Sequence, residues 1–258
     1  PEVAAEGGID PLGLAPIADR LAEEIAPGIT ARMSRIRYLT AMCVAARVLE
    51  RYEDRATPDG TPPFLVLEWI VVEAFARKGA DLPGEGRQIP GIDKARTALL
   101  RKGPLSARNY LKTPNVFGFH GVYRTLGESL RLFDRDRALL EAGERLARIW
   151  EIEQGVQGFL DADVDTEGGK LRRRLDDALE GALRAGHTVT PLSSPLHAEL
   201  LRTFRPGGGG RQERAILASY LLTDREPLRQ EVLLALQSHS RDAAESDYAQ
   251  ILARKASP

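Results

Sequence analysis

The segment FLVLEWIVVEAFARKG (64–79) constrains the fold more than any other part of the chain, because it is apolar nearly all round. A helix without a polar face cannot lie on a surface, so other elements must surround it. Its end, Ala-Arg-Lys-Gly, is typical of a helix that stops at a glycine. The β-branched run at 70–72 would also suit a strand, but the length of the segment favours a helix. We therefore expect a buried central helix.

The rest of the chain reads mainly as amphipathic helices separated by proline and glycine. Apolar residues recur at helical spacing, whereas alternating strand patterns are few. The predicted fold class is therefore mainly α. The further helical patterns cover residues 15–26, 29–55, 105–112, 118–133, 141–160, 170–186, 196–206, 212–224, 226–239 and 243–255.

Three loops suggest how the chain is divided. ADLPGEGRQIPG (80–91) is rich in turn-forming residues, and DADVDTEGG (161–169) is acidic. The run GGGGR (207–211) predicts a flexible hinge or an exposed loop. We expect a C-terminal part that swings on the last two loops. The predicted division is an N-terminal helical domain at 1–91, a central domain at 92–160 and a C-terminal helical domain at 161–258.

Composition excludes several classes of protein. The 258 residues carry a formal net charge of −1, so any anion-binding surface must arise from local segregation of charge. The single cysteine, Cys43, lies in an apolar helical pattern, which excludes a disulfide framework and predicts a buried thiol. No apolar run is long enough to span a membrane, and no signal peptide is recognisable. We therefore expect a cytoplasmic protein without a membrane partner.

One segment does concentrate positive charge. Residues 92–113 contain six basic side chains against the single acid Asp93, a local charge of about +5 in a nearly neutral chain. Such a segment is a candidate surface for phosphate groups. The alternative is a helical subdomain with a solvated basic side. The six basic residues are Lys94, Arg96, Arg101, Lys102, Arg108 and Lys112.

The segment leads into 104–146, where the pattern predicts helix, turn, helix, charged reversal and helix. Thr113-Pro114-Asn115 stops the first short helix, because residues before proline avoid the helical region. The next helix, within 118–133, has an apolar side with helical spacing, and the charged residues of 132–139 predict a tight reversal. The apolar side consists of Phe119, Val122, Leu126 and Leu130.

This order resembles the winged helix-turn-helix regulators over about residues 93–153. The resemblance rests on Leu130, Leu132 and Phe133 before the charged turn and on Leu140 with Gly143 after it. It implies a winged-helix-like unit with at most a small β-hairpin, and it implies DNA binding. The chain departs from the pattern in three glycines of the second helix and in a reversal without glycine at its tip.

If the resemblance holds, the basic side chains Arg108, Lys112 and Arg124 would contact phosphates, with Arg101 and Lys102 beside them. The polar side chains Asn109, His120 and Tyr123 would approach base edges or sugars in the major groove.

The N-terminal segments GIDPLGL (8–14) and PGITARMSRIRYLTA (27–41) resemble the start of uncharacterised bacterial families that occur beside phage-defence genes. The resemblance implies a component of a defence or DNA-modification system and assigns no activity. Arg32 and Arg35 lie one turn apart near the expected start of a helix and form a candidate anion site. Alternatively, they face water or pair with acidic side chains.

No catalytic, metal or cofactor motif stands out. Asp161, Asp163 and Asp165 have the spacing of a calcium loop, but Thr166 replaces the required glycine and Arg172 the final glutamate. No nucleophile-elbow pattern is present. We therefore predict no catalytic residue, no metal site and no cofactor. The four histidines, which lack metal-ligand spacing, are His120, His187, His197 and His239.

The sequence thus favours a non-enzymatic DNA-binding or DNA-sensing component of a bacterial phage-defence or DNA-modification system. The first alternative is a scaffold that docks protein partners of a defence complex, for which an exposed apolar patch is expected on 226–238 or 243–255. The second alternative is an enzyme with a dispersed site, which requires a pocket with converging polar groups.

Overall fold

A computed structural model describes residues 26–30, 32–79, 89–101 and 103–222, with single residues at 16, 20, 23, 24, 230, 231 and 234. Over these residues the chain is mainly helical, which confirms the predicted fold class. One compact unit spans residues 30–220, and a second comprises 1–29 with 221–258. The predicted helices at 226–239 and 243–255 therefore lie almost wholly outside the described residues, and so does the segment 8–14.

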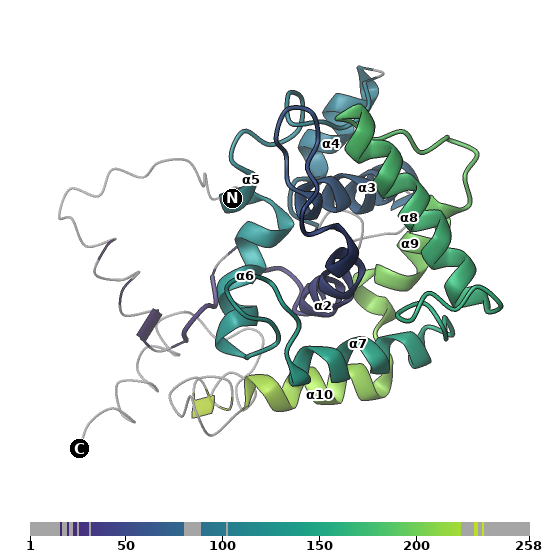
Figure 1. Cartoon of the computed structure of the whole chain (residues 1–258). Coiled ribbons are helices and arrows are strands. Elements are labelled where there is room, and N and C mark those ends of the chain that lie inside the picture. The colour runs from purple at the N-terminus through teal and green to yellow at the C-terminus, as the bar shows by residue number, and fades with distance from the viewer. Residues whose placement is uncertain are drawn as a thin grey trace. The chain divides into compact units, whose positions relative to one another are not determined.

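Figure 1 shows the helices of the larger unit gathered around α2 (Tyr38–Leu49) and α3 (Pro63–Lys78). Among the residues described, no helix combines the length and the apolar character that crossing a membrane requires. The elements are α2 (Tyr38–Leu49), η1 (Glu50–Tyr52), α3 (Pro63–Lys78), α4 (Ile92–Leu100), α5 (Pro114–Phe117), α6 (Phe119–Ser129), α7 (Glu141–Glu153), α8 (Glu167–Ala185), α9 (Leu196–Phe204), η3 (Pro206–Gly208) and α10 (Arg211–Leu221).

Helix α3 is the buried centre that the sequence predicts. Pro63 occupies its first turn, where a missing backbone N–H costs nothing, and the helix packs against α2, α4, α8 and α9. Its large apolar side chains, such as Trp69 and Ile70, are almost fully buried. The strand reading of 70–72 is thereby excluded. The helix also buries two carboxylates, Glu68 and Glu73, which the apolar pattern did not explain.

The helix expected over 29–55 is present only as the shorter helix α2, followed by η1. Helix α2 begins at Tyr38, and the preceding residues form turns whose backbone is bound by the Tyr123 hydroxyl. Cys43 lies inside α2 and is fully buried, as predicted, and burial raises the pKa of its thiol.

Buried contacts cross both expected domain boundaries. The Trp150 ring of α7 stacks on Phe204 of α9 with centroids 5.0 Å apart, and it meets the Phe159 ring edge-on at 5.2 Å. The Trp150 indole N–H also donates to the Thr203 carbonyl at 3.0 Å. Helices α3 and α4 pack together across the other boundary. Residues 91 and 160 therefore both lie inside the compact unit 30–220.

The glycine run 207–210 is held by neighbouring side chains instead of forming a flexible hinge. A side chain at Gly209 would meet the Arg37 guanidinium at 3.1 Å, and one at Gly210 would meet the Glu153 carboxyl carbon at 2.1 Å. The same Glu153 carboxylate accepts the backbone N–H groups of Gln212 and Glu213 at the start of α10. A side chain here would therefore force Arg37 or Glu153 to move away from its hydrogen-bond partners.

Helices α7 and α10 lie side by side and antiparallel (Figure 1). The Glu153 carboxylate at the end of α7 contacts the start of α10, and the Tyr220 hydroxyl at the end of α10 donates to the Ala142 carbonyl at 3.1 Å. Helix α10, which closes the larger unit, is therefore bound to α7 at both of its ends.

Candidate functional site

Residues 130–141 link α6 to α7 through a short hairpin. Its only ladder contact in the described chain is an antiparallel bridge between Phe133 and Leu139. The Asp134 side chain accepts the backbone N–H groups of Asp136 and Ala138, both at 2.9 Å, and thereby holds the turn. The charged reversal expected at 132–139 is thus present and is reduced to a single bridge.

Helix α6 buries two of the residues expected to reach DNA. Tyr123 is fully buried, and its hydroxyl accepts the backbone N–H groups of Ser34 and Arg35 at 3.1 Å. Its ring meets the ring of Tyr38. His120 is 7% exposed and packs edge-on against Phe64. The expectation that these two side chains approach base edges is therefore corrected, because both belong to the core.

Of the other residues expected to contact DNA, two bond to groups of the protein itself and three are exposed cations. The Arg124 guanidinium pairs with Glu128 at 2.6 Å and donates to the Arg135 carbonyl at 2.9 Å. The Asn109 amide closes its own loop, because it accepts the Ser106 N–H and donates to the Pro104 carbonyl. Arg101, Arg108 and Lys112 are exposed, whereas Lys102 lies outside the described residues.

The candidate anion site at Arg32 and Arg35 does not stand at a helix start. Helix α2 begins only at Tyr38, so both arginines precede it. The Arg32 guanidinium lies over the Phe117 ring, 4.7 Å from its centroid. The physical reason offered for this site, the free N–H groups of a helix N-terminus, is therefore missing at these two residues.

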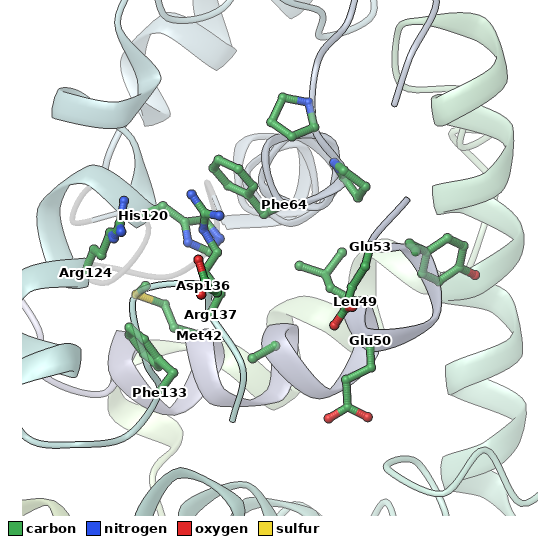
Figure 2. Close-up of a pocket in the computed structure, with 14 residues that line it drawn as sticks. Met42, Leu49, Glu50, Glu53, Phe64, His120, Arg124, Phe133, Asp136 and Arg137 are labelled. Carbon is green, nitrogen blue, oxygen red and sulfur yellow. The ribbon is translucent and has the colours of Figure 1, made fainter. Parts of the chain in front are cut away.

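A pocket of about 250 Å³ lies where the ends of α2 and η1, the start of α3, helix α6 and the hairpin meet (Figure 2). Figure 2 shows the His120 ring and the Arg137 guanidinium close together below Phe64, with Glu50 and Glu53 on the opposite side. The pocket therefore combines an apolar floor with converging polar groups. Its apolar lining includes Met42, Ala46, Leu49, Phe64 and Phe133, and its charged lining also includes Arg124 and Asp136.

His120 is the most unusual group of this pocket. Its Nδ1 atom is buried and has no hydrogen-bond partner within the described part of the chain. Burial, together with the smaller effects of the Arg137 and Arg124 charges, lowers the pKa of the imidazole to about 3. The ring is therefore neutral at physiological pH, although its tautomer is not defined by the heavy atoms.

Arg137 approaches the same space from the hairpin. Its guanidinium lies 3.8 Å from the centroid of the Phe64 ring, which fits a cation–π contact. Its backbone has a φ of 71°, a left-handed conformation that is uncommon for arginine. Its Nε atom is buried and lacks a partner among the residues described. The turn thus directs a cation into the pocket at some conformational cost.

Glu68 of α3 holds the start of helix α6, which carries His120. One carboxylate oxygen accepts the backbone N–H of His120 at 3.3 Å, and the other accepts the Tyr110 hydroxyl at 3.2 Å. Glu68 therefore caps helix α6, whose first residues lack a side-chain cap of their own. A side chain at Gly118 would lie 2.5 Å from the carboxylate, which explains this glycine. Burial raises the pKa of Glu68 to about 7.

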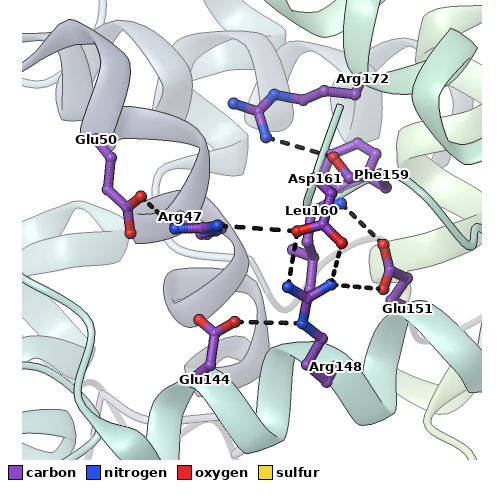
Figure 3. A network of polar contacts seen from close by, with 9 residues as sticks. All are labelled: Arg47, Glu50, Glu144, Arg148, Glu151, Phe159, Leu160, Asp161 and Arg172. Atoms are coloured by element: carbon purple, nitrogen blue, oxygen red, sulfur yellow. Dashed lines mark hydrogen bonds and ion pairs between the residues drawn. The ribbon is translucent and has the colours of Figure 1, made fainter. Parts of the chain in front are cut away.

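The acidic loop considered for calcium is bound by arginine instead (Figure 3). The Arg148 guanidinium forms a two-point pair with the Asp161 carboxylate at 2.7 and 2.8 Å, and it also contacts Glu144 and Glu151. Arg47 approaches Asp161 from α2 at 3.8 Å. In the described ranges, no three His, Cys, Asp or Glu side chains gather closely enough to hold a metal ion.

Sequence reasoning missed Arg137, Glu68 and Phe64 as parts of one site. They come from separate elements, so no spacing along the chain connects them. The one visible signal was a glutamate inside the apolar segment 64–79, since a carboxylate in a buried helix requires specific partners. No protein-family model, curated protein or solved structure matches the chain. The function therefore has to be argued from this geometry.

Proposed function

We propose that the pocket binds a small molecule with an anionic group and that the protein acts by binding. The observation that carries this proposal is the convergence of Arg124, Arg137 and His120 on one pocket with apolar walls. The buried Nδ1 of His120 has no partner in the described chain, and an unsatisfied buried polar atom costs about 1–3 kcal/mol. Because that atom is closed off from solvent, the arginines would make the direct polar contacts with the ligand.

The charges of the pocket suggest how such a ligand is oriented. Its carboxylate or phosphate would lie against the Arg137 guanidinium, because arginine presents several donors to an anion. Met42, Leu49 and Phe133 would contact an apolar body. The carboxylates of Glu50 and Glu53 at the other side disfavour a second negative group, so the far end of the ligand would be neutral or cationic.

The groups present suit recognition better than proton transfer. A general base works best with a pKa near the operating pH, whereas the pKa of His120 is about 3. Glu68 has a pKa of about 7, but its carboxylate is buried and occupied by Tyr110 and by the backbone of His120. This is why we favour a binding protein over the enzyme alternative.

Calorimetric titration and thermal-shift measurements on the full chain test this proposal. Benzoate and phenyl phosphate should raise the melting temperature, whereas the uncharged analogue benzamide should not. Arg137→Gln should weaken binding by about tenfold or more, since a charge-assisted hydrogen bond contributes roughly 1.5–3 kcal/mol. Arg51→Gln removes a charge from a largely exposed arginine and is the matched control. No binding of either anion, or equal binding by both variants, would refute the proposal.

A second candidate function, contact with nucleic acid, is favoured by the exposed cations Lys94, Arg101, Arg108 and Lys112. Because the two aromatic residues expected to read bases are buried, such contacts would involve phosphates and depend little on sequence. This candidate keeps DNA binding, as predicted for a component of a defence or DNA-modification system, but drops the reading of bases.

A salt-titrated binding assay with duplex and single-stranded DNA tests the second candidate. Arg108→Glu with Lys112→Glu should abolish binding, and affinity should fall steeply as salt increases. Arg51→Glu again serves as the control for charge alone. Absence of binding at low salt, or binding unaffected by the double variant, would exclude it.

A further inference from the structure

The two most exposed large apolar side chains of the described chain lie in the same groove. Leu100 at the end of α4 is 83% exposed, and Leu192 in the loop after α8 is 68% exposed. Both line a groove of about 540 Å³ on the surface, together with Leu99 and Ala76. Single exposed leucines are ordinary, but a shared apolar surface formed by separate elements is typical of a contact site.

Three basic side chains form the rest of the groove: Arg77, Lys78 and Arg96. Arg77 is paired with the buried Glu73 at 2.6 Å, and Arg96 lies 3.9 Å from the exposed Asp93. Lys78 is exposed at the end of α3. The groove is therefore lined by apolar contact area and basic side chains, with no acidic residue in its lining.

Hydrogen bonds hold the two walls of the groove together. The backbone N–H of Leu105 donates to the Thr188 hydroxyl at 3.0 Å, and the Thr188 N–H donates to the Leu105 carbonyl at 2.9 Å. The loop is further closed by the Ser194 N–H, which donates to the Pro191 carbonyl. The segment that carries Leu192 is therefore fixed to the segment that follows α4. A preformed groove binds a partner with less loss of conformational entropy.

We propose that this groove docks an acidic amphipathic segment of a partner protein. The apolar side chains of that segment would cover Leu100 and Leu192, and its carboxylates would lie against Lys78 and Arg96. Charge complementarity of this kind selects partners and speeds their encounter. A second copy of this chain fits less well, because a two-fold contact would bring the same cations face to face. The proposal is independent of the ligand pocket.

The shape of the groove favours a protein segment over a membrane surface. An acidic protein segment and an anionic lipid surface would each attract the three cations. A groove encloses a narrow chain segment, whereas a lipid surface contacts apolar groups that protrude. The proposal gives the scaffold alternative a definite surface on α3, α4 and the loop 187–195. The patch expected on 226–238 or 243–255 lies largely outside the described residues.

The test compares two synthetic helical peptides that share the same leucine spacing, one with glutamate and the other with lysine at the flanking positions. Fluorescence anisotropy with the full chain should show binding of the glutamate peptide only, weakened by salt. Leu100→Asp with Leu192→Asp should reduce its affinity at least tenfold. The matched control, Ile152→Asp with Val164→Asp, changes two other exposed apolar residues, which are 60% and 51% exposed, and should leave binding unchanged. Lys78→Glu with Arg96→Glu should reverse the preference between the two peptides.

Failure of the glutamate peptide to bind would overturn the proposal, and so would equal binding of both peptides or equal binding by the groove and control variants. Two further measurements examine the other occupants. Cosedimentation with phosphatidylserine vesicles that is lost only in the groove variant, without peptide binding, would assign the groove to a membrane. Self-association in sedimentation velocity that is lost only in the groove variant would assign it to a second copy.

Discussion

The Arg37 guanidinium and the Glu213 carboxylate form a two-point ion pair, with Nε to Oε1 at 2.9 Å and Nη2 to Oε2 at 3.2 Å. Both side chains are buried, and the two residues lie near opposite ends of the sequence of the larger unit, 30–220. The same guanidinium donates to the Thr203 carbonyl at 3.0 Å and to the Arg205 carbonyl. Arg37 therefore joins the start of α2 to the end of α9 and the start of α10.

Removing one partner of this pair should destabilise the protein strongly. Glu213→Gln is expected to lower the free energy of unfolding by about 3–5 kcal/mol, because it leaves a buried guanidinium without its counter-charge. Arg37→Lys should not substitute, since an ammonium lacks the planar fork that satisfies several acceptors. Urea denaturation measures both changes. As a comparison, Arg51→Ala removes a largely exposed ion pair with Asp176 and should change the free energy of unfolding by at most about 1 kcal/mol.

Gly210→Ala distinguishes a bound loop from a flexible hinge by the sign of its effect. In a mobile linker, alanine would stabilise the protein by roughly 0.4–1 kcal/mol because it restricts the unfolded chain. Here the new methyl group would collide with the Glu153 carboxylate, so we expect destabilisation of about 1–3 kcal/mol. Unchanged or increased stability in thermal unfolding would contradict the description of the loop as bound.

Glu68 should make the stability decrease as pH rises. Its pKa is about 7 in the folded protein against 4.5 as its ordinary value, so the folded state binds the proton more tightly. Stability linked to this group is greatest below pH 4.5 and is lost as pH rises to about 7. The stability of Glu68→Gln relative to the unaltered protein should therefore improve between pH 5 and pH 8. A constant difference across that range would exclude the buried, partly protonated carboxyl.

His120 should contribute in the opposite direction. Its pKa falls from 6.5 to about 3 on folding, so its contribution is fully present above pH 6.5 and is lost as pH falls towards 3. His120→Phe keeps a ring against Phe64 and removes the titrating group. Between pH 6.5 and pH 4, the variant should lose less stability than the unaltered protein. An equal loss in both proteins, measured by chemical denaturation, would show that the imidazole is not held neutral.

Local pattern alone determined the helical class of this protein, the central position of α3 and the place of the hairpin. Each depends on neighbours within a few turns of chain: the all-apolar run at 64–79, the punctuation by proline and glycine, and the charged reversal at 132–139. The apolar side predicted for α6 is likewise buried. These features could be predicted because helix periodicity and turn chemistry are short-range properties.

Only the tertiary structure decided which polar residues face inward. Helix α6 is covered on more than one side, so His120 is buried although the periodicity of the helix places it off the apolar face. Tyr123 lies four residues after Phe119, on the apolar face itself, so its burial follows the helical periodicity. The pocket joins side chains from separate elements. The glycine run has the composition of a linker, yet Arg37 and Glu153 occupy the space beside it. For His120, the pocket and the glycine run, the deciding contact comes from a distant segment, whose approach no local pattern encodes.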